Sequence, residues 1–120
     1  MPNPVVHFEI GCRDREKSAS FYQQLFDWQM TPGAMSTEIR TDPENPTPSP
    51  VTGHIVSLGH EPFNYTNFYV QVPSAADCLA KATELGGKTL IPPIPLPDGS
   101  LFAWFADIDG NTIGILQRKA

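Results

Sequence analysis

His7-Phe8-Glu9-Ile10 and Asn67-Phe68-Tyr69-Val70 are two short runs that stand 60 positions apart in a chain of 120 residues. Apolar and polar side chains alternate along the stretch that contains each run, which is the pattern of a strand with one face in a core. A residue suited to cap a helix follows each run, Asp14 in the first half and Ser74 in the second. The same order of signals therefore occurs twice, and this predicts an internal repeat.

A helix is predicted after each cap, over residues 15–26 and 75–85, and shorter strands are predicted after each helix. These strands cover residues 28–30, 35–41 and 52–58 in the first half, and 88–91, 101–106 and 111–117 in the second. Each half is then a βαβββ module. The chain is predicted to be one domain, residues 1–120, with module one at 1–60 and module two at 61–120.

The predicted fold class is α+β, with two tandem βαβββ modules that join into one curved mixed sheet and helices on its convex side. Phe21, Tyr22, Leu25 and Phe26 are expected to cover the apolar side of the first sheet. Phe68 is expected to share the apolar face of its strand with Val70 and Val72. A ferredoxin-like sandwich is the alternative, but it needs four strands where the sequence indicates about eight.

Charge and cysteine content exclude several classes of partner. The chain has 8 Lys and Arg residues against 13 Asp and Glu residues, a formal net charge of −5. A nucleic-acid groove or an anionic membrane surface needs a basic face, so neither partner is expected. No apolar run is long enough to cross a bilayer. Two cysteines without a secretion signal favour a cytoplasmic protein with free thiols.

Several local features have two readings. Cys12 stands beside Arg13, which would lower the pKa of a reactive thiol, but no histidine and acid accompany it, which favours an inert thiol. The proline-rich residues 92–97 are read as a stiff connection between strands, and a polyproline ligand for a partner protein is the alternative. Residues 42–50, also rich in proline, are predicted to be a loop.

The motif FYxxLFxW over residues 21–28, the corner Leu85-Gly86-Gly87-Lys88 and the run Asp107-Ile108-Asp109-Gly110-Asn111 together carry a family resemblance. In this order they resemble the vicinal-oxygen-chelate superfamily, which includes glyoxalase I, bleomycin-resistance proteins and extradiol dioxygenases. The resemblance covers nearly the whole chain outside the proline-rich loop. It implies a bacterial-type homodimer, and it leaves the reaction open because this scaffold carries many activities.

Enzymes of that superfamily hold a divalent metal with His and Glu side chains from the first and last strand of each module. By the resemblance His7 matches the first ligand, and the 60-residue shift places His54 at a second position. Asn67 and Gly114 fall on the other two, where an amide is a poor ligand and glycine has no side chain. The resemblance therefore implies a degraded metal site and no cofactor. A reduced site of His7, His54 and Glu9 is the remaining possibility for a metal.

Without a metal, function depends on the residues that face the predicted cavity. These ligand-binding candidates are His7, Glu9, His54, Asn67, Tyr69, Phe102 and Trp104. His7 and Glu9 are also the catalytic candidates, as an acid–base pair, whereas the plainer reading of His7 is a neutral imidazole hydrogen-bonded in the pocket wall. The aromatic members suit a planar or apolar ligand, and equally the interior of a core or a dimer interface.

The predicted function is that of a protein which binds a small organic molecule, aromatic or apolar, without a metal. The alternative is a metal-dependent lyase, isomerase or dioxygenase of the glyoxalase and dioxygenase type. The metal content of the purified protein separates the two hypotheses, because only the second requires a bound ion.

Overall fold

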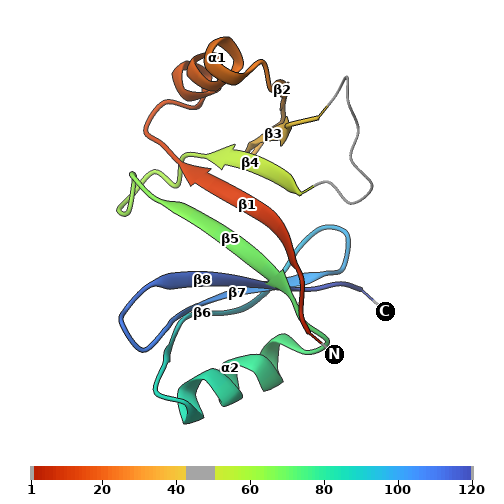
Figure 1. Ribbon diagram of the computed structural model, residues 1–120, viewed down its shortest axis with the longest axis vertical. Coiled ribbons are helices and arrows are strands. Elements are labelled where there is room, and N and C mark those ends of the chain that lie inside the picture. The colour runs from red at the N-terminus through yellow and green to blue at the C-terminus, as the bar shows by residue number, and fades with distance from the viewer. Residues whose placement is uncertain (1, 43–50, 120) are drawn as a thin grey trace. The chain divides into compact units, whose positions relative to one another are not determined.

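The computed structural model describes residues 2–42 and 51–119, which form an α+β fold of two helices and eight strands (Figure 1). These residues divide into two compact units. The first unit is Val6–Thr66, and the second combines the described residues of Met1–Val5 and Asn67–Ala120. The two successive βαβββ patterns confirm the predicted fold class and leave no place for a four-stranded ferredoxin-like sandwich. Most of the predicted loop 42–50 lies outside the described residues.

The first unit has its strands in the order β2-β3-β4-β1. Its elements are β1 (Val5–Gly11), α1 (Arg15–Phe26), β2 (Gln29–Pro32), β3 (Thr37–Arg40) and β4 (Thr52–Val56). β1 runs parallel to β4, and the other neighbouring pairs are antiparallel. The parallel pair sets His7 opposite Thr52 and Glu9 opposite His54. Because side chains two residues apart on a strand share a face, all four polar side chains lie on one face.

The second unit has its strands in the order β5-β8-β7-β6. Its elements are β5 (Thr66–Gln71), α2 (Ala75–Glu84), β6 (Lys88–Pro95), β7 (Leu101–Ala106) and β8 (Thr112–Gln117). β5 runs parallel to β8, with Tyr69 opposite Gly114. β7 and β8 form the antiparallel hairpin predicted at Asp109-Gly110, where Gly110 has a φ of 86° that favours glycine.

Both helices begin at the predicted caps. The Asp14 side chain accepts a hydrogen bond from the Lys17 N–H at 3.1 Å, and the Ser74 hydroxyl accepts one from the Asp77 N–H at 3.1 Å. Each bond satisfies an amide that has no partner within the first turn of its helix, which is why such residues start helices. Neither helix, in the part of the chain that the structure describes, is long and apolar enough to cross a bilayer.

The core of the second unit lies beneath α2. Its buried members are Val72, Ala75, Leu79, Ala103 and Ile115, and Val70, Cys78 and Phe105 pack against them. The location of Phe105 on the helix side fits the alternation of β7. Phe68, which is predicted to share the apolar face of Val70 and Val72, is 42% exposed and lies outside this cluster. This core takes Val70 near the end of β5 and Val72 just after the strand, close to the start of α2.

The first helix does not cover its sheet as predicted. Phe21, Leu25 and Phe26 are 60%, 59% and 52% exposed, and no residue of α1 is buried. The ring of Trp28, which follows the helix, instead packs near Phe8 of β1 with 6.0 Å between ring centroids. α1 contributes through stacking of Tyr22 on this tryptophan, so an aromatic residue after the helix takes the place expected for the helix itself.

β6 is twice as long as predicted, because residues 92–95 continue the strand and are not a separate connection. Proline has no N–H to donate to a neighbouring strand, so it is tolerated only at the edge of a sheet or at a bulge. β6 has both features. It is the last strand in the order of the second unit, and its register against β7 shifts between Thr89 and Ile91 and again between Ile91 and Ile94.

Candidate functional site

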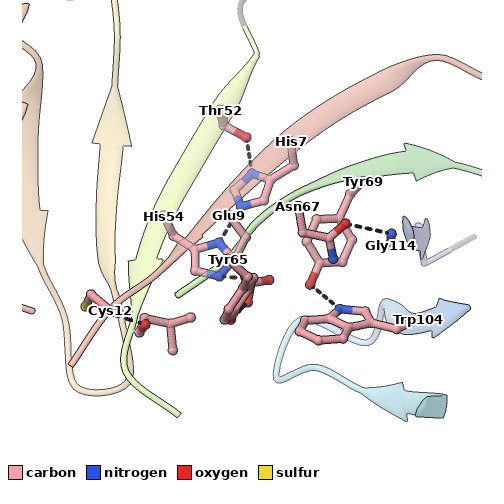
Figure 2. Close-up of polar contacts among 11 residues, drawn as sticks. His7, Glu9, Cys12, Thr52, His54, Tyr65, Asn67, Tyr69, Trp104 and Gly114 are labelled. Carbon is pink, nitrogen blue, oxygen red and sulfur yellow. Dashed lines mark hydrogen bonds and ion pairs between the residues drawn. The ribbon is translucent and has the colours of Figure 1, made fainter. Parts of the chain in front are cut away.

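A chain of polar contacts runs across β1 and β4 in the first unit, and we call it the histidine chain (Figure 2). Its members are Thr52, His7, His54, Glu9 and Tyr65. Thr52 Oγ1 is 2.6 Å from His7 Nδ1, and His7 Nε2 is 2.6 Å from His54 Nδ1. His54 Nε2 lies 3.4 Å from Glu9 Oε1, and the Tyr65 hydroxyl donates to Glu9 Oε2. The two imidazoles thus connect a hydroxyl at one end to a carboxylate at the other.

Tyr65 reaches the chain from the residue before β5, because its backbone is tied to the end of β1. Its carbonyl accepts a hydrogen bond from the Gly11 N–H at 2.8 Å. The ring then lies directly over Gly11, where any added Cβ would collide with it. Glycine at position 11 is therefore what allows the tyrosine to reach the carboxylate of Glu9.

Glu9 is only 3% exposed, and a buried carboxylate is costly unless donors surround it. The bond from Tyr65 supplies one donor, and the His54 ring edge faces the other oxygen. Burial, followed by the hydrogen bond to Glu9, raises the pKa of Tyr65 well above its ordinary value near 10. The phenol consequently stays protonated and keeps donating to the carboxylate over the whole physiological range.

The second unit has its own polar group on β5, β7 and β8 (Figure 2). Trp104 Nε1 donates to the Tyr69 hydroxyl at 2.8 Å, and the backbone N–H of Gly114 donates to Asn67 Oδ1 at 3.1 Å. Asn67, Tyr69 and Trp104 are 5%, 6% and 7% exposed. Asn67 Nδ2 is buried and has no hydrogen-bond partner among the described residues, which marks an amide that can still donate to a water or a ligand.

A cavity of about 580 Å³ lies beside the histidine chain in the first unit, and both His7 and Thr52 line it. Its other polar lining residues are Gln29, Thr31, Glu38, Arg40 and Asp42. They come from the same polar face, since Gln29 stands opposite Arg40, Thr31 opposite Glu38 and Glu38 opposite His54. The Arg40 side chain is paired with Asp42 at 3.6 Å. The cavity has the size of a small-molecule site and is rich in hydrogen-bonding groups.

A second cavity, of about 560 Å³, lies on the helix side of the second unit. Leu85, Phe105 and Ile108 give it an apolar lining, and Cys78 lies at its wall. Burial raises the pKa of the Cys78 thiol, and burial followed by the charge of Asp14 raises that of Cys12. Neither cysteine is therefore activated as a nucleophile at neutral pH, in agreement with the inert reading of Cys12.

The positions that the superfamily resemblance names for metal ligands do not converge on one point in this structure. His54 directs Nδ1 to His7 and Nε2 to Glu9, so its two neighbours lie beside different nitrogens of one ring. At Gly114 a Cβ would lie 2.6 Å from Tyr69 Cδ2, so the tyrosine ring occupies the space that a ligating side chain needs. Within residues 2–42 and 51–119, no three His, Cys, Asp or Glu side chains are grouped to bind a metal.

The predicted site residues therefore fall into two groups. His7, Glu9 and His54 come together in the first unit, whereas Asn67, Tyr69 and Trp104 come together in the second, with Phe102 on the same strand as Trp104.

Sequence reasoning missed Thr52, Tyr65 and the polar residues of β2 and β3. Period-two alternation could have found Thr52, two positions before His54, and the pair Glu38 and Arg40. Tyr65 gives no such signal, because it precedes its strand.

Solved structures of the same fold include several enzymes. A variant of methylmalonyl-CoA epimerase from Streptomyces coelicolor, in complex with 2-nitronate-propionyl-CoA, has 12% identity, a TM-score of 0.67 and 97% coverage of both chains. Methylmalonyl-CoA epimerase from Mycobacterium tuberculosis has 7% identity and a TM-score of 0.70, with 97% of this chain and 88% of that one covered. At such identities the likeness shows the fold alone.

A third structure with this fold is described as an NAD-dependent benzaldehyde dehydrogenase from Legionella pneumophila. It has 16% identity and a TM-score of 0.66, and covers 98% of this chain and 100% of that one. No curated protein matches the chain significantly. A family model, that of the Glyoxalase/Bleomycin resistance protein/Dioxygenase superfamily, matches residues 5–115. This match spans nearly the whole chain, and the chain belongs to that superfamily.

Proposed function

We propose that this member of the superfamily binds a small organic molecule, aromatic or apolar in its main part, without using a metal ion. One observation carries the proposal. The two histidines that occupy metal-type positions are hydrogen-bonded to each other at 2.6 Å, and the second of them turns its other nitrogen to Glu9. The three side chains are therefore arranged in a row of neighbouring contacts, whereas the ligands of a metal ion must all point to one position.

The first-unit cavity supports this function by its size and its lining. About 580 Å³ is enough for a small organic molecule. Ile39 and Val51 supply apolar surface, and Gln29, Thr31 and Thr52 supply neutral hydrogen-bonding groups. Small-molecule sites combine such surfaces, because apolar contact gives affinity and a few polar groups fix orientation.

Metal content tests the proposal directly. Protein purified without chelator should contain far less than one equivalent of any transition metal by elemental analysis. His7→Ala should contain no less metal than the wild type, because the imidazole is bound to Thr52 and His54 and is not a ligand. His60→Ala, at an exposed histidine outside the histidine chain, is the matched control. Stoichiometric metal that disappears only in His7→Ala would overturn the proposal.

The second candidate is a metal-dependent lyase, isomerase or dioxygenase. The proximity of His7, His54 and Glu9 favours it, because these residues would need only a rotation of the His54 ring to form a two-histidine, one-carboxylate set. Turnover of a glutathione hemithioacetal or a catechol, dependent on an added divalent metal and abolished in His54→Ala, would establish this candidate in place of the first.

The proposal also covers the location of the protein, its assembly and its partners. We propose a cytoplasmic homodimer whose partner is a small molecule and which binds neither nucleic acid nor membrane. The net charge of −5 supports the absence of polyanionic partners. The epimerase from Streptomyces coelicolor is described with a CoA derivative bound, which is an example of a small organic ligand on this fold.

A further inference from the structure

The direction of the hydrogen bonds in the histidine chain is set from its buried end. An ionised carboxylate has only acceptors, and Glu9 accepts from the Tyr65 hydroxyl on one oxygen. The other oxygen faces His54 Nε2 at 3.4 Å, so a neutral His54 carries its proton on Nε2. The other ring nitrogen of His54, Nδ1, is then unprotonated, and its lone pair can accept a hydrogen bond. Each later bond in the chain follows from this choice, because a neutral imidazole has one donor and one acceptor.

His54 Nδ1, as an acceptor, requires a donor from His7, and the two atoms are 2.6 Å apart. His7 therefore carries its proton on Nε2 and presents a lone pair on Nδ1. The atom facing that lone pair at 2.6 Å is Thr52 Oγ1, so the threonine hydroxyl donates its only proton to His7. The alternative acceptor of Thr52, the Val6 carbonyl, is farther away at 3.4 Å.

Thr52 is exposed and lines the 580 Å³ cavity. With its proton committed to His7, its oxygen retains only lone pairs for a ligand. We infer that Thr52 Oγ1 acts only as a hydrogen-bond acceptor toward a ligand in this cavity. The cavity therefore prefers ligands that present a hydroxyl donor to Thr52, such as a phenol, over the corresponding ethers. This inference rests on the proposed function and names the ligand class of that same cavity.

The neighbouring charges leave this preference in place. Arg40, on the neighbouring strand β3, contacts Asp42 through Nε at 3.6 Å, and the rest of its guanidinium remains a donor in the cavity wall. Glu38 stands opposite His54 and adds an acceptor to the wall. The preference for a ligand hydroxyl is therefore local to Thr52, whose oxygen can only accept.

The matched probes are 4-methylphenol and 4-methylanisole, which differ by one methyl group on the oxygen. Binding is measured by calorimetry at about pH 8, which lies below the ionisation of the phenol and above the ordinary ionisation range of an imidazole. A neutral hydrogen bond to Thr52 should make the phenol bind about threefold to tenfold tighter than the anisole. In Thr52→Val, which keeps the shape but removes the oxygen, the ratio should fall to about one. Thr112→Val, the residue 60 positions later in the other unit, should keep the wild-type ratio.

The second readout is independent of any ligand. Nitrogen-15 NMR of the three histidines reports which ring nitrogen carries the proton. His7 and His54 should both be protonated on Nε2 in the wild type. In Glu9→Gln the amide can donate to His54, so both rings should shift toward protonation on Nδ1 and the phenol preference should fall toward one.

His7 protonated on Nδ1 in the wild type would overturn the inference. Equal affinity for the two probes would overturn the hydroxyl preference while leaving the binding function intact. Failure of both probes to bind would overturn the proposed function for this cavity, and with it the preference.

Discussion

Among single residues, Glu9 has the most demanding environment. Its carboxylate is almost fully buried on β1, and burial of a charge is tolerated only where donors compensate for lost water. Tyr65 is the donor with a hydroxyl aimed at it, and the hydroxyl reaches it because Gly11 leaves room for the ring. The histidine chain therefore depends on Tyr65, which precedes its strand, and on Gly11, four positions after His7.

Tyr65→Phe should lower the free energy of unfolding by about 1.5–3 kcal/mol at neutral pH, since it removes a hydrogen bond to a charged group and leaves the ring in place. Urea denaturation measures the change. The same substitution at Tyr22, whose ring keeps its stacking on Trp28 as phenylalanine, should change stability by less than about 0.5 kcal/mol. Equal effects of the two substitutions would show that the Glu9 contact contributes nothing.

Tyr65 should also affect how the stability of the protein depends on pH in the alkaline range. Its pKa is raised in the folded protein, so above pH of about 10 the unfolded chain loses the phenol proton while the folded chain keeps it. The folded state then binds more protons, and its stability falls as pH rises. The wild type should lose stability more steeply than Tyr65→Phe above that pH, and parallel curves would contradict the assigned direction of the shift.

The elements differ in what they add to stability. α2 buries Ala75 and Leu79 against the sheet of its unit, whereas α1 has no buried residue and packs Tyr22 and Phe26 on Trp28. The two helices carry equivalent caps, so the difference lies in their side-chain packing and not in how they begin.

A matched pair of truncations tests this difference. Leu79→Ala should cost about 2–4 kcal/mol, because Leu79 is 7% exposed within the core cluster. Leu25→Ala, at a residue that is 59% exposed on α1, should cost less than about 1 kcal/mol. Thermal or urea unfolding of both variants measures the two losses of stability for comparison. A larger loss at Leu25 would mean that α1 is covered by something else in solution.

Sequence periodicity predicted the elements well where each strand has an apolar and a polar side. The caps at Asp14 and Ser74 and the hairpin at Gly110 follow from local chemistry, and all three are present. The exposure of Phe21 could not be predicted, because the apolar period of a helix does not reveal that Trp28 beyond it packs near Phe8.

For the site, alternation placed His7 and Glu9 on one face, the 60-residue shift added His54, and the structure joins the three by direct contacts. Alternation along one strand does not give the register between that strand and its neighbours. The pairing of His7 with Thr52 and the approach of Tyr65 come from contacts between residues more than forty positions apart. No single-sequence pattern encodes such distances.

At the scale of the whole molecule, the two modules have kept one fold and lost chemical equivalence. A shift of 60 residues relates Glu9 to Tyr69 and His54 to Gly114. In the first unit these positions hold a carboxylate facing an imidazole, and in the second an aromatic ring lying over a glycine. The candidate chemistry is therefore concentrated in the first unit.

Assembly is the prediction that belongs to this scale. The superfamily resemblance predicts a homodimer, so sedimentation equilibrium at micromolar concentration should give twice the chain mass of 13.2 kDa. A mass of one chain across the micromolar range would contradict the dimer.

The proline-bearing strand at the end of the second unit has one more consequence. A free sheet edge invites another chain to add itself as a further strand, which is the first step toward fibrils. Pro92, Pro93 and Pro95 remove three amide protons from β6, and its two register shifts bend what is left. An incoming strand would find acceptors with few matching donors. The prolines that belong to this strand thus disfavour the addition of a further strand to its edge.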